Sequence, residues 1–500
     1  MFASALLLAA WGVVLLATFH YPASPLDEGT LVAYPSRLLQ GYWPHRDYVT
    51  FYGPANVWVL GAAFKLFGAS LVVERAVGLA FRMLALGSAI AIGARFGRAP
   101  AVAGAAMAAV TWLPWTVQAN AGLTAIALAL LALALLSRAD SPVQRRASLL
   151  AALAGATAGL VLLVRFDFLP AIAVAIVPLL VALPGRRRAF FAGLAPMLVI
   201  AMAHLVLIGP GAIERVLQDI VASGPGRDLP LPSRHTDDGR LFTLSVIVAV
   251  VATSTGLVAM RRRRHPEAAL LAAIGLLGGG LLPYMDGRAD VFHISSGGAV
   301  ACITLCCLLG YVFQRITTNR LLGGFAVGIV AFGAASEVTS LGTAKLLLEY
   351  RLGANDGVAS SDVHVADRSY RLTPTAAHRL QPILDTLDEV AKPGQRLYVG
   401  PHDLRFAEYN DSYLYFLLPQ LRPAAIYWED NPGTVNGRRY DLGAHLLRAD
   451  FLVLNRAYDP TTAGPVPGSS KPNEIVARDF CPLLVSGTYE LLARRGPACD

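Results

Sequence analysis

Charged residues are scarce in this chain. Aspartate, glutamate, lysine and arginine make up 15% of its 500 residues, whereas soluble proteins carry about 25%. Cysteine is scarce as well, with five residues. The low charge excludes a disordered chain and an ordinary soluble enzyme, and the low cysteine content excludes a small disulfide-rich scaffold.

Long apolar runs take the place of charge. Hydrophobic residues make up 55% of the chain, and no charged side chain occurs from Ala99 to Ser137. Because about 20 apolar residues cross a bilayer as a helix, the sequence predicts a polytopic α-helical membrane protein. Eleven membrane helices are expected, at residues 2–19, 70–94, 100–117, 121–137, 147–164, 168–184, 189–208, 241–260, 267–284, 296–314 and 321–341.

The basic residues gather in short loops between the apolar runs. Such loops stay in the cytoplasm, so the net charge of +8 reports topology rather than nucleic-acid binding. We expect a multi-pass protein of the plasma (inner) membrane with a cytoplasmic N-terminus, whose first run is a retained helix rather than a signal peptide. Eleven crossings then place residues 345–500 outside the cytoplasm. The basic loops contain Arg95, Arg98, Arg145, Arg146, Arg186 to Arg188, Arg261 to Arg264, Arg315 and Arg320.

The sequence predicts two domains, a transmembrane domain at 1–344 and a small extracytoplasmic α/β domain at 345–500. Apolar residues from Thr373 to Lys392 follow helical spacing. Short strands are expected at Gln395–Val399, Asp450–Leu454 and Thr488–Ala493. Cys481 and Cys499 can form a disulfide if this domain is extracytoplasmic, whereas Cys302, Cys306 and Cys307 lie in an apolar run and are expected to pack there.

The first outer loop, residues 20–69, is too polar to lie in lipid. Its segment Val57–Phe67 is amphipathic, and such helices lie along a membrane surface. The adjacent carboxylates Asp27 and Glu28 begin this loop. Acidic groups at a membrane boundary are often functional, although Asp27 as the cap of a following helix is an equally good interpretation.

The first hundred residues carry a recognisable order of motifs. After Asp27-Glu28 come Gly41-x-x-Pro44-x-x-Asp47, then Gly53-Pro54 at the start of the surface helix, then Phe67-Gly-Ala-Ser70 with Arg75 five residues on. In this order and spacing the sequence resembles the GT-C membrane glycosyltransferases, in particular the protein O-mannosyltransferase-like and aminoarabinose-transferase-like branch. The alternating topology and the segment 416–423 extend the resemblance. It implies a GT-C-like fold.

The resemblance also implies an enzyme that transfers a sugar from a polyprenyl-phosphate-linked donor to an acceptor at the extracytoplasmic face. Asp27 matches the first acid of the family pair and is expected to be the general base, because the attacking hydroxyl must lose its proton. Glu28 is expected to orient Asp27 or to bind the acceptor, and the two acids can exchange roles. Asp47 is expected to be a supporting acid. The acceptor is expected to be a glycan, a lipid or a protein. The reaction is expected to belong to the biosynthesis of cell-envelope glycans.

The leaving phosphate needs positive charge where its anion develops. Arg165 is one candidate, and its alternative roles are an ion pair with Asp167 or a side chain that snorkels to the membrane surface. Arg288 and His293 are the other candidates, and the alternative is a solvated loop. Arg234 and His235, in the long outer loop 209–240, are weaker candidates for part of a lid.

No cofactor is expected to be required. The carboxylates of Asp27, Glu28 and Asp47 are ligands that suit Mg²⁺ or Mn²⁺, but the resembled branch mostly works without a metal, and no His/Cys spacing for zinc is present. Aromatic residues in the tail suggest either sugar stacking or, as the favoured interpretation, an ordinary core. They are Tyr409, Tyr413, Tyr415, Tyr427 and Trp428.

Two other classes of function compete with the transferase. A transporter or flippase of lipid-linked sugars is the main alternative, but transporters commonly carry charged or broken helices at the membrane midplane. The predicted helix interiors are nearly free of charge, and the charges gather at one face. A scaffold subunit with a degenerate site is the third class.

Overall fold

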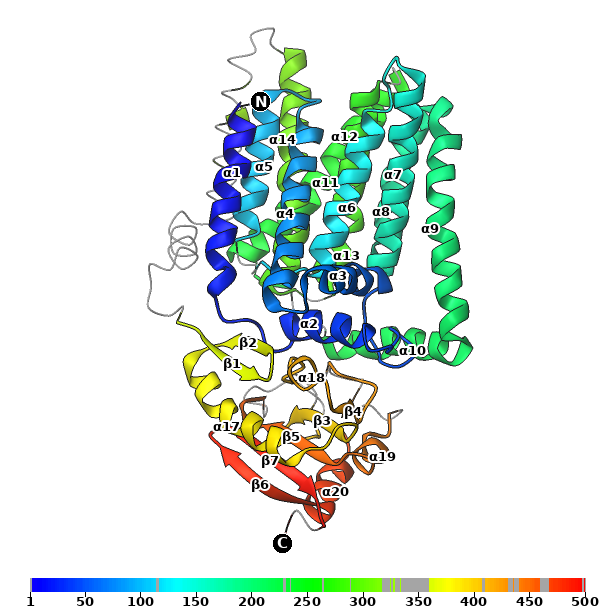
Figure 1. The fold of residues 1–500 in the computed structure, drawn as a ribbon. Helices are drawn as coiled ribbons and strands as arrows, with labels where there is room; N and C mark the ends of the chain where they lie inside the picture. Colours follow the sequence, from blue (N-terminus) through cyan, green and yellow to red (C-terminus); the bar gives the residue numbers. More distant parts are fainter. Residues whose placement is uncertain are drawn as a thin grey trace. The chain divides into compact units, whose positions relative to one another are not determined.

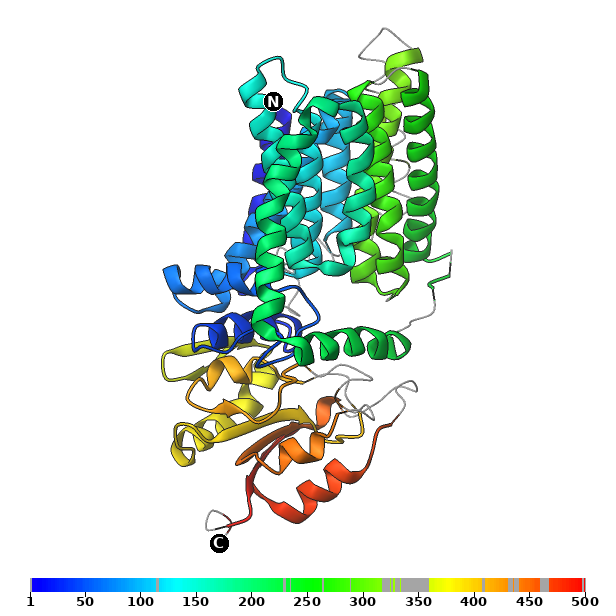
Figure 2. The same ribbon diagram turned by 90° about the vertical axis from the view of Figure 1, so that its right-hand side faces the viewer.

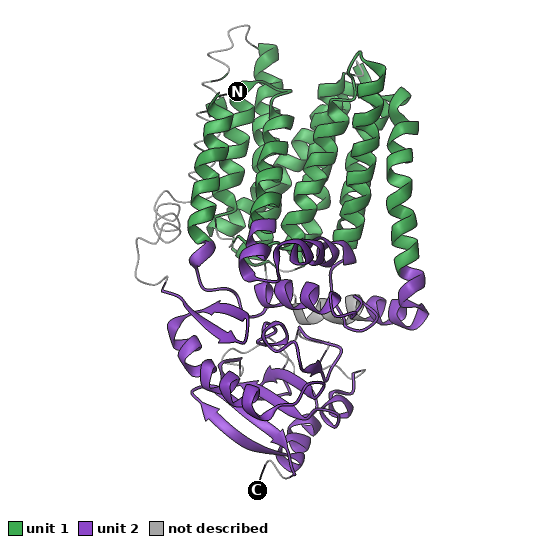
Figure 3. Cartoon of the chain, viewed as in Figure 1, with its two compact units in different colours: residues 1–18, 78–204, 228–355 green, residues 19–77, 205–227, 356–500 purple. Residues whose placement is uncertain are grey.

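The chain folds into two compact units, which Figure 3 colours separately. The computed structural model describes residues 2–113, 117–227, 231–233, 235–262, 265–287, 289–316, 324, 327–328, 333, 359–406, 410–429, 435, 440–458, 467–496 and 499, with the side chains of 219–227 excepted. Unit 1 comprises residues 1–18, 78–204 and 228–355. Unit 2 comprises residues 19–77, 205–227 and 356–500, so the first outer loop and the C-terminal region belong to the same unit. The predicted domain boundary at residue 344 stays a prediction.

Unit 1 is built from long helices that run side by side (Figures 1 and 2). They form because their sequences are apolar on nearly all sides, which suits burial in a bundle or in lipid. The helices that lie in this unit wholly or for most of their length are α1 (Phe2–Ala17), α4 (Leu71–Gly93), α5 (Arg98–Thr111), α6 (Ala121–Ser137), α7 (Gln144–Val164), α8 (Leu169–Ala182), α9 (Arg187–Ile208), α11 (Asp237–Arg262), α12 (Pro266–Gly280), α13 (Leu282–Asp286) and α14 (Val291–Ile316).

Seven helical segments in the described part of the chain are long and apolar enough to cross a membrane, and two shorter apolar helices accompany them. The prediction of a multi-pass helical membrane protein is therefore confirmed. Ten of the eleven predicted segments are helical, whereas most of residues 321–341 lie outside the described residues. The number eleven and the orientation in the membrane stay predictions.

Several predicted helix ends differ from the observed ones. The helix expected at 100–117 ends at Thr111, and the one expected at 267–284 is interrupted after Gly280, where a run of three glycines weakens it. The helix expected at 296–314 begins earlier, at Val291, because the Asp290 side chain accepts a hydrogen bond from the His293 N–H and caps the first turn.

Small residues set the distance between neighbouring helices of unit 1. A Cβ atom added to Gly155 of α7 would collide with the Phe190 carbonyl of α9, and one added to Gly193 of α9 would collide with the Ala152 carbonyl of α7. Glycine at both positions lets the two backbones approach closely, as is usual where membrane helices pack.

Unit 2 contains two helices from the first outer loop, α2 (Asp27–Leu38) and α3 (Pro54–Phe67). The expected helix at Val57–Phe67 is therefore present, and Pro54 extends it because proline suits the first helical turn. Apart from the alternative that Asp27 caps a following helix, the sequence did not predict α2. Pro35 in its third turn and its mixed polarity hide the helical pattern. Unit 2 also contains α10 (Pro210–Arg227), which lies within the loop expected at 209–240.

The C-terminal region of unit 2 is mixed α/β, as expected. Its sheet has the order β4-β3-β5-β7-β6, in which β3 pairs in parallel with β4 and β5, and β7 pairs antiparallel with β5 and β6. The three predicted strands and the predicted helix are confirmed as β3, β5, β7 and α17. The elements are β1 (Ser361–Val365), β2 (Arg368–Leu372), α17 (Pro374–Val390), β3 (Arg396–Pro401), α18 (Leu414–Leu417), β4 (Arg422–Pro423), α19 (Leu442–Leu446), β5 (Phe451–Asn455), α20 (Lys471–Asp479), β6 (Phe480–Ser486) and β7 (Tyr489–Arg494).

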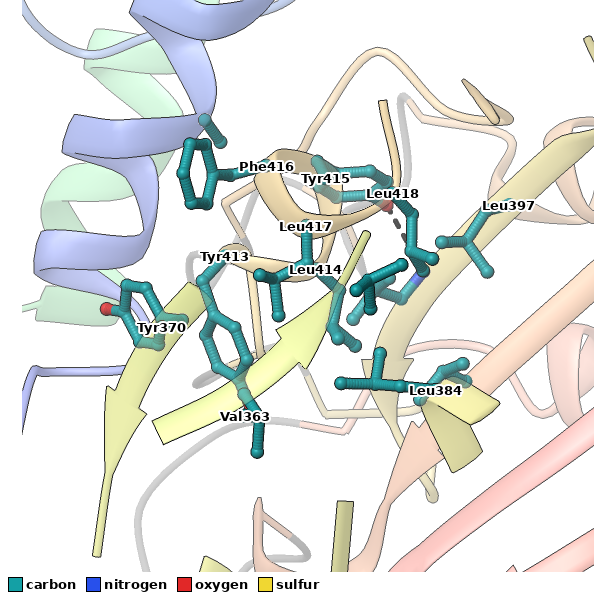
Figure 4. Close-up of a cluster of buried hydrophobic side chains, with 14 of the residues drawn as sticks. Val363, Tyr370, Leu384, Leu397, Tyr413, Leu414, Tyr415, Phe416, Leu417 and Leu418 are labelled. Atoms are coloured by element: carbon teal, nitrogen blue, oxygen red, sulfur yellow. Dashed lines mark hydrogen bonds between the residues drawn. The ribbon is translucent and has the colours of Figure 1, made fainter. Parts of the chain in front are cut away.

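The aromatic side chains of this region are core residues. Figure 4 shows Tyr413 and Tyr415 among buried apolar side chains, with the Tyr370 ring beside that of Tyr413. Tyr427 and Trp428 are also buried. The interpretation as an ordinary core is confirmed for these four tail aromatics, because buried rings cannot stack on a sugar; Tyr409 lies outside the described residues.

Candidate functional site

The acidic motif lies at the first turn of α2, where carboxylates interact favourably with the helix dipole. The two acids differ sharply in environment. Glu28 is fully buried, whereas Asp27 is exposed. Asp27 is the first residue of the helix rather than its cap, and its Oδ2 accepts a hydrogen bond of 3.2 Å from the Ser24 hydroxyl. The motif therefore offers one carboxylate to solvent and keeps the other inside.

Glu28 forms an ion pair with Arg75, the fifth residue of α4. Arg75 Nε lies 2.8 Å from Oε1 and Nη2 lies 3.1 Å from Oε2, and both side chains are at most 1% exposed. The same guanidinium donates to the carbonyls of Phe19 and Tyr21. Arg75 thus ties the acidic motif to the chain on both sides of the first outer loop.

Residues from the C-terminal region hold the chain just before the motif. The Tyr370 hydroxyl donates to the Ser24 carbonyl at 2.7 Å. The Ser412 hydroxyl lies 3.1 Å and 3.0 Å from the carbonyls of Pro25 and Leu26. The position of the acids therefore depends on residues nearly 400 positions later in the sequence, all within unit 2.

Asp47 shapes a turn of the first outer loop. Its Oδ2 accepts hydrogen bonds from the Trp43 N–H at 2.6 Å and from Arg46 Nη2 at 2.8 Å. The hydrogen bond between Asp47 and Arg46, together with the charge of the carboxylate, raises the pKa of Arg46. Two residues on, Val49 donates to the Ile426 carbonyl at 2.9 Å. The supporting role expected for Asp47 stays a prediction.

The candidate cations Arg165 and His293 come together in unit 1, on either side of Tyr284. The Arg165 guanidinium carbon lies 4.8 Å from the centre of the Tyr284 ring, and the centre of the His293 ring lies 4.7 Å from the same point. Arg165 directly follows α7, Tyr284 lies in α13 and His293 lies in the first turn of α14. Tyr284 was not predicted from the sequence as a site residue. Its position, a polar aromatic residue just before the predicted outer loop, could have identified it.

Each of the two cations has a carboxylate beside it. Arg165 forms a two-point ion pair with Asp167, with distances of 2.9 Å and 2.6 Å, so the alternative role expected for it is observed. His293 Nδ1 lies 2.7 Å from Asp290 Oδ1. Arg288 and Arg234 lie outside the described residues, and His235 is exposed.

The N-terminus of α6 lies against this cluster. The Asn120 side chain caps the helix by accepting the Gly122 N–H at 2.7 Å. A Cβ atom added to Gly122 would lie 2.9 Å from the Tyr284 hydroxyl and 3.4 Å from Arg165 Nη1. Glycine therefore permits the close approach of the helix end to the Arg165–Tyr284 pair, and a helix N-terminus adds partial positive charge there.

No group of three or more histidine, cysteine, aspartate or glutamate residues suited to a metal ion occurs within the part of the chain that the structure describes. Glu28, one of the three acids considered as a metal ligand, is bound to Arg75. The expectation that the protein requires no metal or cofactor is not tested by this observation and stays a prediction.

The fold is similar to that of ArnT from Cupriavidus metallidurans. The crystal structure of ArnT bound to undecaprenyl phosphate matches with a TM-score of 0.55 at 15% sequence identity, and the match covers 100% of this chain and 98% of that chain. The apo crystal structure of the same protein matches with the same TM-score and coverage at 14% identity. No family profile and no curated protein sequence matches the chain. The resemblance to GT-C glycosyltransferases that the sequence motifs suggested is confirmed at the level of the fold.

Proposed function

We propose that the protein is a glycosyltransferase that moves a sugar from a polyprenyl-phosphate donor to an acceptor hydroxyl. The observation that carries this proposal is the difference in environment between the two acids of the motif. Arg75 neutralises Glu28 in the interior, and Asp27 remains as the carboxylate that faces solvent beside it. The similarity in fold to ArnT, which binds undecaprenyl phosphate, supports the class of donor.

Asp27 is the general base of the proposed reaction. Its carboxylate takes the proton of the acceptor hydroxyl as the hydroxyl oxygen forms a bond to the anomeric carbon of the sugar. Glu28 does not take the proton in this role. Its part is to fix the first turn of α2 through Arg75, so that the Asp27 backbone is held in one place.

Arg165 and His293 stabilise the leaving group in this proposal. The bond between the anomeric carbon and the phosphate oxygen breaks, the electron pair stays with the phosphate, and the two cations balance the charge that develops. The phosphate would compete with Asp167 for the Arg165 guanidinium, which is held in place by its contact with the Tyr284 ring.

We also propose that unit 2 faces the extracytoplasmic side. The disulfide between Cys481 and Cys499 supports this orientation, because disulfides are rare in the cytoplasm.

The test is transfer by the purified protein in liposomes that contain a polyprenyl-phosphate sugar. Loss of a general base lowers the rate by about 10²–10⁴-fold, so Asp27→Asn should lose transfer to that extent and keep donor binding. Asp388→Asn, which changes an exposed aspartate of α17, is the matched control and should transfer normally. Wild-type turnover in Asp27→Asn would contradict the assignment. Translocation of the lipid-linked sugar without transfer would instead support the transporter alternative.

A further inference from the structure

A polar pocket of about 520 Å³ lies in unit 2, at the C-terminal end of α2. Its volume falls in the range of small-molecule sites, about 300–1,000 Å³. No role has been assigned to it above, and its lining is mostly polar. The lining residues are Arg37, Gln40, Gly41, Tyr42, Arg46, Asp47, Gly394, Pro419, Gln420 and Arg422.

Arg37 places a buried positive charge at this pocket. Its side chain is 1% exposed, and its guanidinium donates to the carbonyls of Tyr415, Leu418 and Pro419 and to the Gln40 side chain. All four acceptors are neutral, so their oxygens orient the guanidinium without cancelling its charge. Burial lowers the pKa of Arg37 to about 10, which leaves it protonated at neutral pH.

Two further arginines add charge at the rim. Arg422 is exposed, and its side chain has no hydrogen bond or ion pair to the residues that the structure describes. Arg46 is about half exposed and pairs with Asp47 at 2.8 Å. The pocket thus presents three guanidinium groups against one carboxylate, and its lining also includes the amides of Gln40 and Gln420.

The backbone of the pocket is open. Gly41 and Gly394 have φ values of 93° and 89°, and a Cβ atom added to either would meet nothing within 4 Å. A ligand can therefore approach the backbone at both turns. A pocket that combines a fixed buried guanidinium, two rim guanidiniums and neutral amides is suited to a hydrophilic anion, because arginine pairs with carboxylates and phosphates at two points.

We propose that this pocket binds an acidic saccharide group, a sugar that carries a carboxylate or a phosphate, as part of the acceptor. The inference rests on the proposed function, since it names the substrate class of that reaction. Asp27 and Arg37 lie ten residues apart on α2, which is about 15 Å along a helix axis. The acidic group is therefore a different unit of the acceptor from the sugar or other group whose hydroxyl reacts.

The test is binding of three probes to the purified full chain in nanodiscs, without donor. The probes are glucuronate, glucose 6-phosphate and neutral glucose, with inorganic phosphate as a fourth ligand. We expect the two acidic sugars to bind more tightly than glucose and inorganic phosphate, and high salt to weaken them. Loss of one charge-assisted contact costs about tenfold in affinity, so Arg422→Gln should weaken both acidic probes by that factor, and Arg422→Glu by more.

Arg448→Glu is the matched control, because Arg448 is an exposed arginine of the same unit outside the pocket. Gln420→Trp fills the pocket without changing charge and should also abolish binding. Arg37 is left unchanged, since it holds three carbonyls of the core.

Each outcome decides the proposal. Equal affinity for glucose and the acidic sugars, or binding that survives both Arg422→Glu and Gln420→Trp, would overturn it. Inorganic phosphate binding as tightly as glucose 6-phosphate would also overturn it and leave a simple ion site. Acidic-sugar binding by a protein that performs no transfer would contradict the proposed function alone, and transfer without such binding would contradict this inference alone.

Discussion

Glu28 and Arg75 form a buried ion pair in which Arg75 Nε lies 2.8 Å from Glu28 Oε1. The two residues are 47 positions apart and join the first turn of α2 to the N-terminal part of α4. A pair of this kind is a poor source of net stability, because burying both charges costs nearly as much as their attraction returns. Its consequence is positional, because neither charge can be buried without the other, and the pair therefore fixes the first turn of α2 against α4.

Breaking this pair should destabilise the protein strongly. Glu28→Gln leaves the Arg75 charge buried without its carboxylate, at an expected cost of about 3–5 kcal/mol. Thermal unfolding of the detergent-purified protein should therefore shift to a clearly lower temperature. Asp27→Asn, the neighbouring change at an exposed position, should unfold like the wild type. Equal melting of Glu28→Gln and wild type would show that the pair does not hold the motif.

Gly122 should be required for the geometry of the cation cluster. In Gly122→Ala the new Cβ would lie 2.9 Å from the Tyr284 hydroxyl, so Tyr284 and the Arg165 side chain on it must shift. A displacement of this size lowers turnover by about tenfold to a hundredfold, which transfer kinetics at varied donor concentration would measure. Gly87→Ala in α4 is the matched control, because its Cβ would meet nothing within 4 Å. Equal turnover in the two variants would argue against a role for the cluster.

Asp411 should make the stability of unit 2 depend on pH. Burial raises the pKa of this carboxyl from 3.8 to about 6, and hydrogen bonds from Asn455 and Tyr458 offset only part of that effect. A raised pKa in the folded state means that stability is greatest where the group is protonated in both states, and falls as pH rises through about 6. The shift corresponds to about 3 kcal/mol between pH 4 and pH 7.

The measurement is the difference in unfolding between wild type and Asp411→Asn across that pH range, which removes the contribution of other carboxylates. Wild type should lose stability relative to the variant as the pH rises. Asp388→Asn, at an exposed position of α17, should follow the wild-type profile. A difference that stays constant from pH 4 to pH 7 would rule out Asp411 as the cause.

The disulfide offers a direct test of orientation. Cys302, Cys306 and Cys307 are buried free thiols, whereas Cys481 and Cys499 are paired. A membrane-impermeant maleimide should therefore label intact cells only after mild reduction, and the label should map to Cys481 and Cys499. Cys481→Ser should show label at Cys499 without reduction. Labelling that requires permeabilised cells would place unit 2 in the cytoplasm.

The sequence predicted the elements whose signal is local. Apolar runs locate helices because any segment of about 20 apolar residues has the same favourable transfer into lipid. A stripe of five apolar residues located α17 in the same way. Leu380, Ile383, Leu384 and Leu387 are buried, whereas Val390, the last residue of the helix, is exposed. The helix α2 was not predicted because its buried side chains contact the C-terminal region, as Arg37 contacts the Tyr415 carbonyl, rather than forming an apolar stripe of their own.

The candidate site shows the same division. The acidic pair, Arg165 and His293 were identifiable because carboxylates, guanidiniums and imidazoles are rare beside apolar runs. The difference in burial between Asp27 and Glu28 could not be predicted, because the sequence does not show which of two adjacent acids pairs with a distant residue such as Arg75. The pocket at Arg37 could not be predicted from the sequence either, because its walls come from segments nearly 400 residues apart.

Composition and the order of motifs alone determined that this chain crosses a membrane many times, carries a mixed α/β region at its C-terminal end and has an acidic motif after its first helix. These properties follow from the transfer free energy and chemistry of each segment by itself. Only the tertiary structure decided which acid is buried, which aromatic rings belong to the core and which candidate cations contact the same tyrosine ring. Those outcomes depend on burial and on partners that are distant in sequence, and no local pattern encodes either.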